Sequence, residues 1–181
     1  MKTSKYLALL RGINVGGKNM LQMKDLAAMF VAAGCSDVAT YIQSGNVVFR
    51  ANEKVASGLS GMISQEIEKQ FGIRVPVVLR SAEEMGGVVR GNPFLKMGVA
   101  EDLLHLCFLA DSPAAEDIAR LDVARSAPDA FEMAGSEIYL MLPNGMARTK
   151  LTNAYFDSKL KTVSTARNWR TTLNLAQMLA N

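Results

Sequence analysis

Residues 9–20, LLRGINVGGKNM, come close to the pattern of a phosphate-binding loop. Four residues separate Gly12 from Gly17 and Lys18, as in the G-x-x-x-x-G-K loop whose backbone N–H groups wrap a phosphate. That loop continues with Ser or Thr, whose hydroxyl binds magnesium, whereas Asn19 stands here. The pattern therefore favours a general anion-binding turn over a magnesium-dependent nucleotide triphosphatase.

The composition of this turn supports two interpretations. In the first, the glycines leave backbone N–H groups open to an anion, and Arg11 and Lys18 supply positive charge. In the second, the glycines only form a tight turn, while Asn14 and Asn19 hydrogen-bond the local backbone. A turn by itself requires neither Arg11 nor Lys18. The candidate ligand-binding residues of this segment are Arg11, Asn14, Gly16, Gly17, Lys18 and Asn19.

Two other polar segments are candidate parts of the same binding site. Residues 43–46, QSGN, are a turn signal flanked by side-chain amides. Residues 165–171, TARNWRT, begin beside a candidate helix cap at Ser164 or Thr165. A helix starting there would carry Arg167 in its first turn, where the helix dipole disfavours a cation unless function or a tertiary contact compensates. The candidates in these segments are Gln43, Ser44, Asn46, Arg167, Asn168 and Trp169.

Each of these segments also has a purely structural interpretation. Polar amides beside a hairpin turn are common, Trp169 can anchor a helix in the core, and Arg167 can pair with an acidic residue such as Asp117. If the segments instead form one ligand site, we expect Arg11, Lys18 and Arg167 to converge in space.

The C-terminal segment supports an alternative function, the binding of nucleic acid. Residues 148–181 contain six Lys or Arg and one Asp or Glu, a net charge of +5, whereas residues 91–147 contain three and nine, a net charge of −6. Lys150, Tyr155 and Phe156 illustrate an interleaving of basic and aromatic residues that can neutralise and stack single-stranded nucleic acid. The overall charge of +3 is nevertheless low for a dedicated DNA-binding domain.

The reactive side chains limit the chemistry that the chain can perform. His105 is the only histidine, and Cys35 and Cys107 lie far apart without a C-x-x-C motif, which indicates buried thiols and neither a metal site nor a cofactor. No spacing resembles a catalytic triad or a carboxylate pair, so no catalytic residue is assigned. Residues 1–15 do not resemble a signal peptide, and no run of about 18 uncharged apolar residues occurs, which predicts a cytoplasmic protein without membrane contact.

Apolar periodicity predicts the elements that position these residues. The first half is expected to contain a strand at 5–10, a helix at 22–33, a hairpin at 37–51, a helix at 53–71 and a strand at 73–80. Gly45 can take a positive φ in the hairpin turn. This order of elements is that of a ferredoxin-like fold.

The second half is predicted to repeat the theme. A short helix capped by Ser81, with Glu84 three residues on, runs into a Gly/Asn/Pro turn that ends the first subdomain. Beyond it we expect a strand at 102–110, a helix at 112–125 capped by Ser112, a hairpin at 129–142, and helices at 149–160 and 166–180. The predicted fold is α+β, with two ferredoxin-like (strand-helix-strand-strand-helix) halves, antiparallel sheets and extra C-terminal helices, in subdomains 1–90 and 91–181.

With these segments identified, the chain resembles the bacterial domain of unknown function 1697 family nearly from end to end. The resemblance rests on ALLRGINVGGKN (8–19), TYIQSGNVVF (40–49), RVPVVLRS (74–81), EIYLMLPNG (137–145) and TARNWRT (165–171). It implies a fold with two ferredoxin-like halves and no established activity. Ala166 stands where the family more often has Thr, while Arg167, Asn168 and Trp169 match.

Taken together, the residues predict a cytoplasmic protein that binds a small phosphate- or carboxylate-bearing ligand at the glycine-rich loop 11–19. The alternative is a nucleic-acid-binding protein that uses the basic segment 148–170, in which Lys150 is a further candidate contact. A second alternative is a structural or oligomerisation module that pairs through exposed sheet edges.

Overall fold

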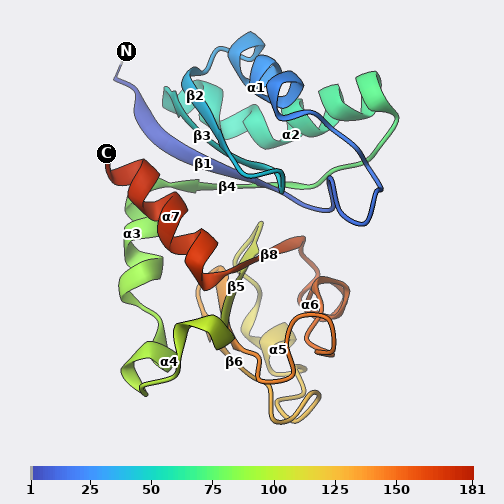
Figure 1. The fold of residues 1–181 in the computed structure, drawn as a ribbon, viewed down its shortest axis with the longest axis vertical. Helices are drawn as coiled ribbons and strands as arrows, with labels where there is room; N and C mark the ends of the chain where they lie inside the picture. Colours follow the sequence, from blue (N-terminus) through green and yellow to red (C-terminus); the bar gives the residue numbers. More distant parts are fainter. Residues whose placement is uncertain (1) are drawn as a thin grey trace. The chain divides into compact units, whose positions relative to one another are not determined.

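Two four-stranded antiparallel sheets form the framework of the chain, which a computed structural model describes over residues 2–181 (Figure 1). The chain divides into two units. Unit 1 contains the residues up to Gly86 together with Leu175–Asn181, and unit 2 contains Gly87–Asn174. The α+β class and the antiparallel sheets predicted from the sequence are therefore confirmed.

The sheet of unit 1 is covered on one face by two helices. Its strands are β1 (Ser4–Leu10), β2 (Ser36–Tyr41), β3 (Asn46–Ala51) and β4 (Val77–Ser81), in the spatial order β2-β3-β1-β4. The helices α1 (Met23–Ala32) and α2 (Glu53–Phe71) lie side by side over this sheet (Figure 1). Apolar side chains from both layers form one core cluster that includes Ala8, Leu10, Leu26, Phe30, Phe49, Leu59 and Ile63. The element order predicted for the first half is confirmed.

The ends of α2 show why the prediction for this element succeeds. The Asn52 side chain accepts a hydrogen bond from the Val55 N–H (3.0 Å), which caps the first turn. Gly72 ends the helix with a φ of 69°, and its N–H donates to the Glu68 carbonyl (2.8 Å). The start signal at Asn52 and the stop signal at Gly72 are both local, so the predicted range 53–71 matches the observed helix.

Unit 2 is built around a sheet of the same strand order. Its strands are β5 (Leu104–Leu109), β6 (Ala130–Ala134), β7 (Glu137–Met141) and β8 (Ser164–Asn168), in the order β6-β7-β5-β8. The other elements are α3 (Ala82–Arg90), which begins in unit 1, α4 (Pro93–Lys96), a short 3-10 helix (Glu101–Leu103), α5 (Ala115–Ile118), α6 (Asn153–Leu160) and α7 (Trp169–Ala180), which ends in unit 1. Side chains of β5 and β7 pack against Phe156 and Leu160 of α6 to form the core of this unit.

The helix predicted at 112–125 is wrong over most of its length, because only Ala115–Ile118 is helical. Ser112 does not cap it; the Ser112 hydroxyl instead lies 2.8 Å from the Ser136 hydroxyl. Farther on, the Asp122 N–H donates to the Tyr155 hydroxyl (2.8 Å), a bond to a distant residue in place of a helical one. Tertiary hydrogen bonds therefore override the local helix propensity of this segment.

The final helix begins later than predicted, at Trp169, and residues 164–168 form the strand β8. This strand pairs with β5, with Thr165 opposite Phe108 and Arg167 opposite Leu106. The Asn168 side chain accepts the Thr171 N–H (2.8 Å) and caps the helix in place of Ser164 or Thr165. Because the strand is polar, it lacks the apolar alternation by which strands are predicted. Arg167 therefore lies in a strand, and the helix-dipole argument does not apply to it.

Gly45 offers a test of the turn between β2 and β3. It has a φ of 77°, and a Cβ there would lie 2.7 Å from Leu10 Cβ and 2.9 Å from Ile13 Cδ1. We expect Gly45→Ala to lower the free energy of unfolding by about 2–5 kcal/mol, from about 1–2 of left-handed strain and about 1–3 of overpacking. Gly16→Ala is the matched control, since its φ is also positive but a Cβ there meets no described atom within 4 Å. Equal losses in urea unfolding of the two variants would contradict the packing argument.

Candidate functional site

The glycine-rich loop is a miniature hairpin. Val15 and Lys18 form an isolated antiparallel bridge, and the Lys18 N–H donates to the Val15 carbonyl (3.0 Å). Gly16 and Gly17 occupy the two central positions with φ values of 58° and 72°, the signs that a type I′ turn requires. The Lys18 N–H is therefore already bonded within the hairpin, unlike the free N–H groups that surround a phosphate in a phosphate-binding loop. Only the tip of the hairpin could contact an anion.

Asn14 and Asn19 hold this hairpin in shape. The Asn14 side chain donates to the Leu21 (2.8 Å) and Gln43 (2.9 Å) carbonyls and accepts the Leu21 N–H (2.8 Å). The Asn19 side chain donates to the Gly12 carbonyl (2.8 Å). Both asparagines have a positive φ, 54° and 50°. Their side chains therefore make the backbone contacts of the structural interpretation, which rigidify the turn.

The turn at residues 43–46 lies beside the glycine loop. The bond from Asn14 to the Gln43 carbonyl joins the two segments, and the Leu10 N–H donates to the Gly45 carbonyl (2.8 Å) at the base of the loop. Asn46 is fully buried, and its side chain donates to the Tyr41 carbonyl (3.1 Å) and the Ser44 hydroxyl (3.0 Å). Asn46 therefore shapes the turn, whereas the Gln43 side chain is exposed.

The tip of the glycine loop presents a cationic and partly aliphatic surface. Lys18 is exposed, and Arg11, which is half-buried, is anchored by its N–H to the Pro76 carbonyl (3.1 Å). Val15 and Met20 of this loop are 63% and 67% exposed. Residues 9–24 contain three Lys or Arg and no Asp or Glu, so this segment carries a net positive charge.

The candidates of the 165–171 segment have structural contacts in unit 2. Arg167 donates from Nη1 to the Thr165 hydroxyl (2.8 Å) and the Ala166 carbonyl (2.9 Å). Burial lowers the pKa of Arg167 to about 10, so its side chain stays charged at neutral pH. Trp169 is fully buried, as its structural interpretation expects. Arg167 belongs to unit 2 and the glycine loop to unit 1, and their convergence stays a prediction.

Asp117 does not pair with Arg167. It forms ion pairs with Arg120 (3.1 Å) and Lys161 (2.8 Å). The acidic residue is itself buried, whereas both cationic partners are exposed. The Asp117–Lys161 pair links the C-terminal end of α6 to α5, which is a structural role.

A buried polar network fixes the backbone around Lys150, the remaining sequence candidate. The Ser126 hydroxyl donates to Asp129 (2.8 Å) and accepts the Lys150 N–H (2.9 Å). Asp129 also accepts the Asn144 N–H (3.0 Å). Burial alone would raise the pKa of Asp129, but hydrogen bonds from Asn144, Ser126 and Thr149 outweigh it and hold the pKa below its usual value. The Lys150 side chain itself is exposed.

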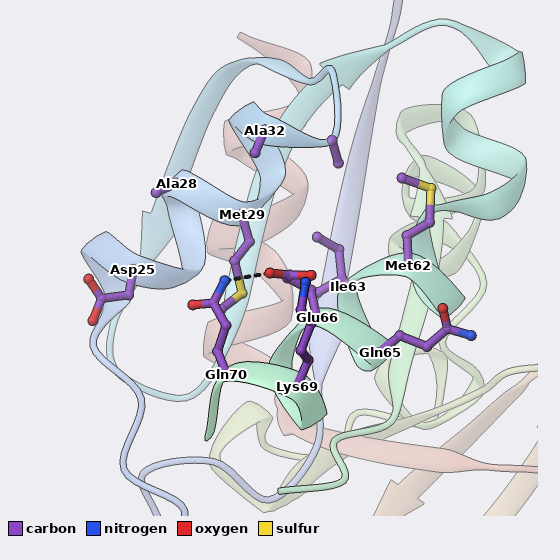
Figure 2. A pocket seen from close by; sticks show the side chains of 11 residues that line it. Asp25, Ala28, Met29, Ala32, Met62, Ile63, Gln65, Glu66, Lys69 and Gln70 are labelled. Atoms are coloured by element: carbon purple, nitrogen blue, oxygen red, sulfur yellow. Dashed lines mark hydrogen bonds between the residues drawn. The ribbon is translucent and has the colours of Figure 1, made fainter. Parts of the chain in front are cut away.

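A groove between α1 and α2 is a feature that sequence reasoning missed. It has a volume of about 690 Å³, within the range of small-molecule sites. Figure 2 shows Met29 and Ile63 between the two helices, with the Gln70 amide donating to Glu66 (2.6 Å) beside them. In the sequence, both helices show only the apolar stripe of an ordinary core, so no signal distinguishes the groove. None of the predicted site residues lines it.

Burial affects the two thiols and the single histidine of the chain. Cys35 and Cys107 are buried, and burial raises the pKa of the Cys35 thiol to about 11. Burial also lowers the pKa of His105, against a smaller opposing effect of the Leu103 carbonyl. Over residues 2–181, no three His, Cys, Asp or Glu side chains gather as metal ligands would. In the same range, no helix combines the length and apolarity needed to cross a membrane.

Comparison with known proteins identifies the family. The chain belongs to the family described as "Protein of unknown function (DUF1697)", whose model matches residues 3–139. A conserved bacterial protein from Streptococcus pneumoniae has a similar structure, with a TM-score of 0.73 and 22% sequence identity over 98% of this chain and 99% of that one. This likeness shows a shared fold. No curated protein matches the chain.

The Asp129 network predicts a stability difference that depends on pH. Asp129→Asn should lower the free energy of unfolding by about 2–3 kcal/mol at pH 7, because a charged acceptor is lost. The native pKa lies below the unfolded value of about 3.9, so the contribution is complete above that value and is lost as the pH falls through the native pKa.

Urea unfolding at pH 7 and at pH 3 checks this prediction. The gap between the parent protein and Asp129→Asn should shrink at pH 3. Glu116→Gln, which changes an exposed acidic residue, is the control and should show no such gap. An equal gap for Asp129→Asn at both pH values would count against the charged network.

Proposed function

We propose that this DUF1697 protein binds a small phosphate- or carboxylate-bearing ligand at the tip of the glycine loop, residues 11–19. The observation that carries the proposal is the exposed type I′ turn, in which Gly16 and Gly17 are followed by the exposed Lys18. A Cβ at either glycine would meet no described atom within 4 Å, so an anion can approach the backbone closely there.

The rigidity of the turn supports binding. The bonds of Asn14 to Leu21 and Gln43, and of Asn19 to Gly12, hold the loop before any ligand arrives. A preorganised loop loses little conformational entropy when it binds, so more of the interaction energy remains as affinity. The asparagine contacts are therefore compatible with a ligand site, because they orient the tip without occupying it.

The side chains of the loop favour binding over catalysis. The loop offers cations, amides and aliphatic groups, with Lys18 at the tip and Arg11 at the base. A cation and one or two backbone N–H groups suit a single phosphate or carboxylate group. Two such charge-assisted bonds at about 2 kcal/mol each correspond to a Kd of about 1 mM for a simple anion. A natural ligand would add contacts from its remaining atoms.

The nucleic-acid alternative loses part of its original support. Tyr155 and Phe156 are 7% and 0% exposed, so neither aromatic ring of the 148–170 segment is available to stack on a base. Any contact of this segment with nucleic acid would have to rest on its cationic side chains.

Thermal unfolding in the presence of anions tests the ligand proposal. Inorganic phosphate at about ten times a Kd of 1 mM should stabilise the protein by about 1.4 kcal/mol and raise its Tm by about 3–5 °C at constant ionic strength. Sugar phosphates, nucleotides and organic acids should then be ranked by the same shift. Lys18→Gln and Arg11→Ala should abolish the shift, because each removes a cation of the site.

Lys69→Gln is the matched control. It removes the same charge from an exposed position in the last turn of α2 and should keep the full shift. A shift that survives in Lys18→Gln, or the lack of any shift with all of these anions in the parent protein, would disprove the proposal.

A further inference from the structure

Two loops of unit 2 are held side by side. The first, residues 119–129, joins α5 to β6, and the second, residues 142–152, joins β7 to α6. The Lys150 N–H bonds to the Ser126 hydroxyl (2.9 Å), and the Asn144 N–H bonds to Asp129 (3.0 Å). Both acceptors are buried, so the pairing of the loops is protected from water.

The same pairing brings Arg125 to the basic segment. Its Nε donates to the Lys150 carbonyl (2.9 Å), and its guanidinium lies 4.0 Å from the centre of the Tyr155 ring. The Tyr155 hydroxyl in turn accepts the Asp122 N–H (2.8 Å). Arg125 thus has a fixed direction although the residue is exposed.

These paired loops carry three exposed cationic residues, Arg125, Arg148 and Lys150, which together make up the cation cluster. Within residues 2–181, none of the three forms an ion pair with a carboxylate. The neighbouring Asp129 is buried and bonded to Ser126 and Asn144, and the exposed Asp122 accepts the Ala124 N–H (2.9 Å). Within the described residues, the positive charge of the cluster is therefore not neutralised by ion pairs.

We propose that this cation cluster binds the phosphate backbone of nucleic acid. The cluster is exposed on two loop tips, and a small anion there would stay largely hydrated, whereas a polyanion can engage all three cations at once. The planar Arg125 fork, aimed by two contacts, matches discrete phosphate oxygens better than the diffuse charge of a bilayer. The exposed Val123 (77%) and Met146 (43%) lie on the same loops and can pack against sugars.

Because the aromatic rings of this segment are buried, the cation cluster would contact the phosphates and would not recognise the bases. Binding is therefore expected to be independent of sequence and steeply dependent on salt. The residues of this site all belong to unit 2, whereas those of the glycine loop belong to unit 1. The two proposals can consequently fail independently.

Fluorescence anisotropy with a labelled 20-nucleotide single-stranded oligonucleotide tests the proposal on the full chain. With three phosphate contacts, the logarithm of the association constant should fall with the logarithm of the salt concentration with a slope of about −2. Arg125→Gln, Arg148→Gln and Lys150→Gln should each weaken binding about five-fold and reduce the slope by about 0.7. The Arg148 side chain makes none of the hydrogen bonds that hold the two loops together. Arg148→Gln therefore still tests the proposal if Arg125→Gln fails to fold.

Two controls make the outcome decisive. Lys96→Gln removes an exposed cation elsewhere in unit 2, and Lys69→Gln removes an exposed cation of unit 1; both should leave oligonucleotide affinity unchanged. The proposal is overturned if the parent protein does not bind at 50 mM salt, or if Lys96→Gln weakens binding as much as Arg148→Gln. Binding to phosphatidylglycerol vesicles without binding to the oligonucleotide would also overturn it and indicate a membrane surface.

Discussion

The candidate site of unit 1 depends on the hydrogen bonds of the Asn14 side chain. Its three hydrogen bonds tie the glycine loop to its own return at Leu21 and to the Gln43 carbonyl in the β2–β3 turn. Gly45 makes this approach possible, since a Cβ there would collide with Leu10 and Ile13. The loop thus becomes a rigid hairpin whose tip carries two open glycines and a lysine. Without the hydrogen bonds of Asn14, the same residues would form a flexible glycine-rich segment, and the binding of an anion would have to order them.

In unit 2 as well, polar side chains fix the backbone that carries exposed cations. Its two loops are held together by a buried serine and aspartate, Ser126 and Asp129, and the exposed cations stand on the fixed backbone. In both units a hydrogen-bonded polar side chain fixes the backbone that carries a cation. In unit 2 these polar groups are buried, where a polar atom that lacks its partner is costly. The two sheets have the same strand order, yet the loops that carry the cations are not equivalent. The shared topology therefore does not imply a repeated site, and the fold by itself does not identify a function.

The sequence predicts the fold where the signals are local. The apolar stripe of α2 with Asn52 and Gly72 at its ends, and the Ser81–Glu84 capping box, where the Ser81 N–H donates to Glu84 (2.6 Å), are sufficient by themselves. The prediction fails where distant partners decide. The segment after Ile118 is not helical, because it forms hydrogen bonds to Tyr155 and within the Ser126 network instead. The polar strand β8 can be identified only from its pairing with β5. For the same reason Arg125 could not be placed beside Lys150, since 24 intervening residues separate their positions in the chain.

Anion binding at the tip of the glycine loop can be tested by an NMR titration of ¹⁵N-labelled protein with inorganic phosphate. Backbone amide resonances report binding residue by residue, without any assumption about a reaction. Binding at the tip should produce saturable shifts of the Gly16, Gly17 and Lys18 amide resonances, while the amide resonances of the α1–α2 groove should not shift. Saturable shifts confined to other residues, or no shifts at 20 times the expected Kd of about 1 mM, would contradict it.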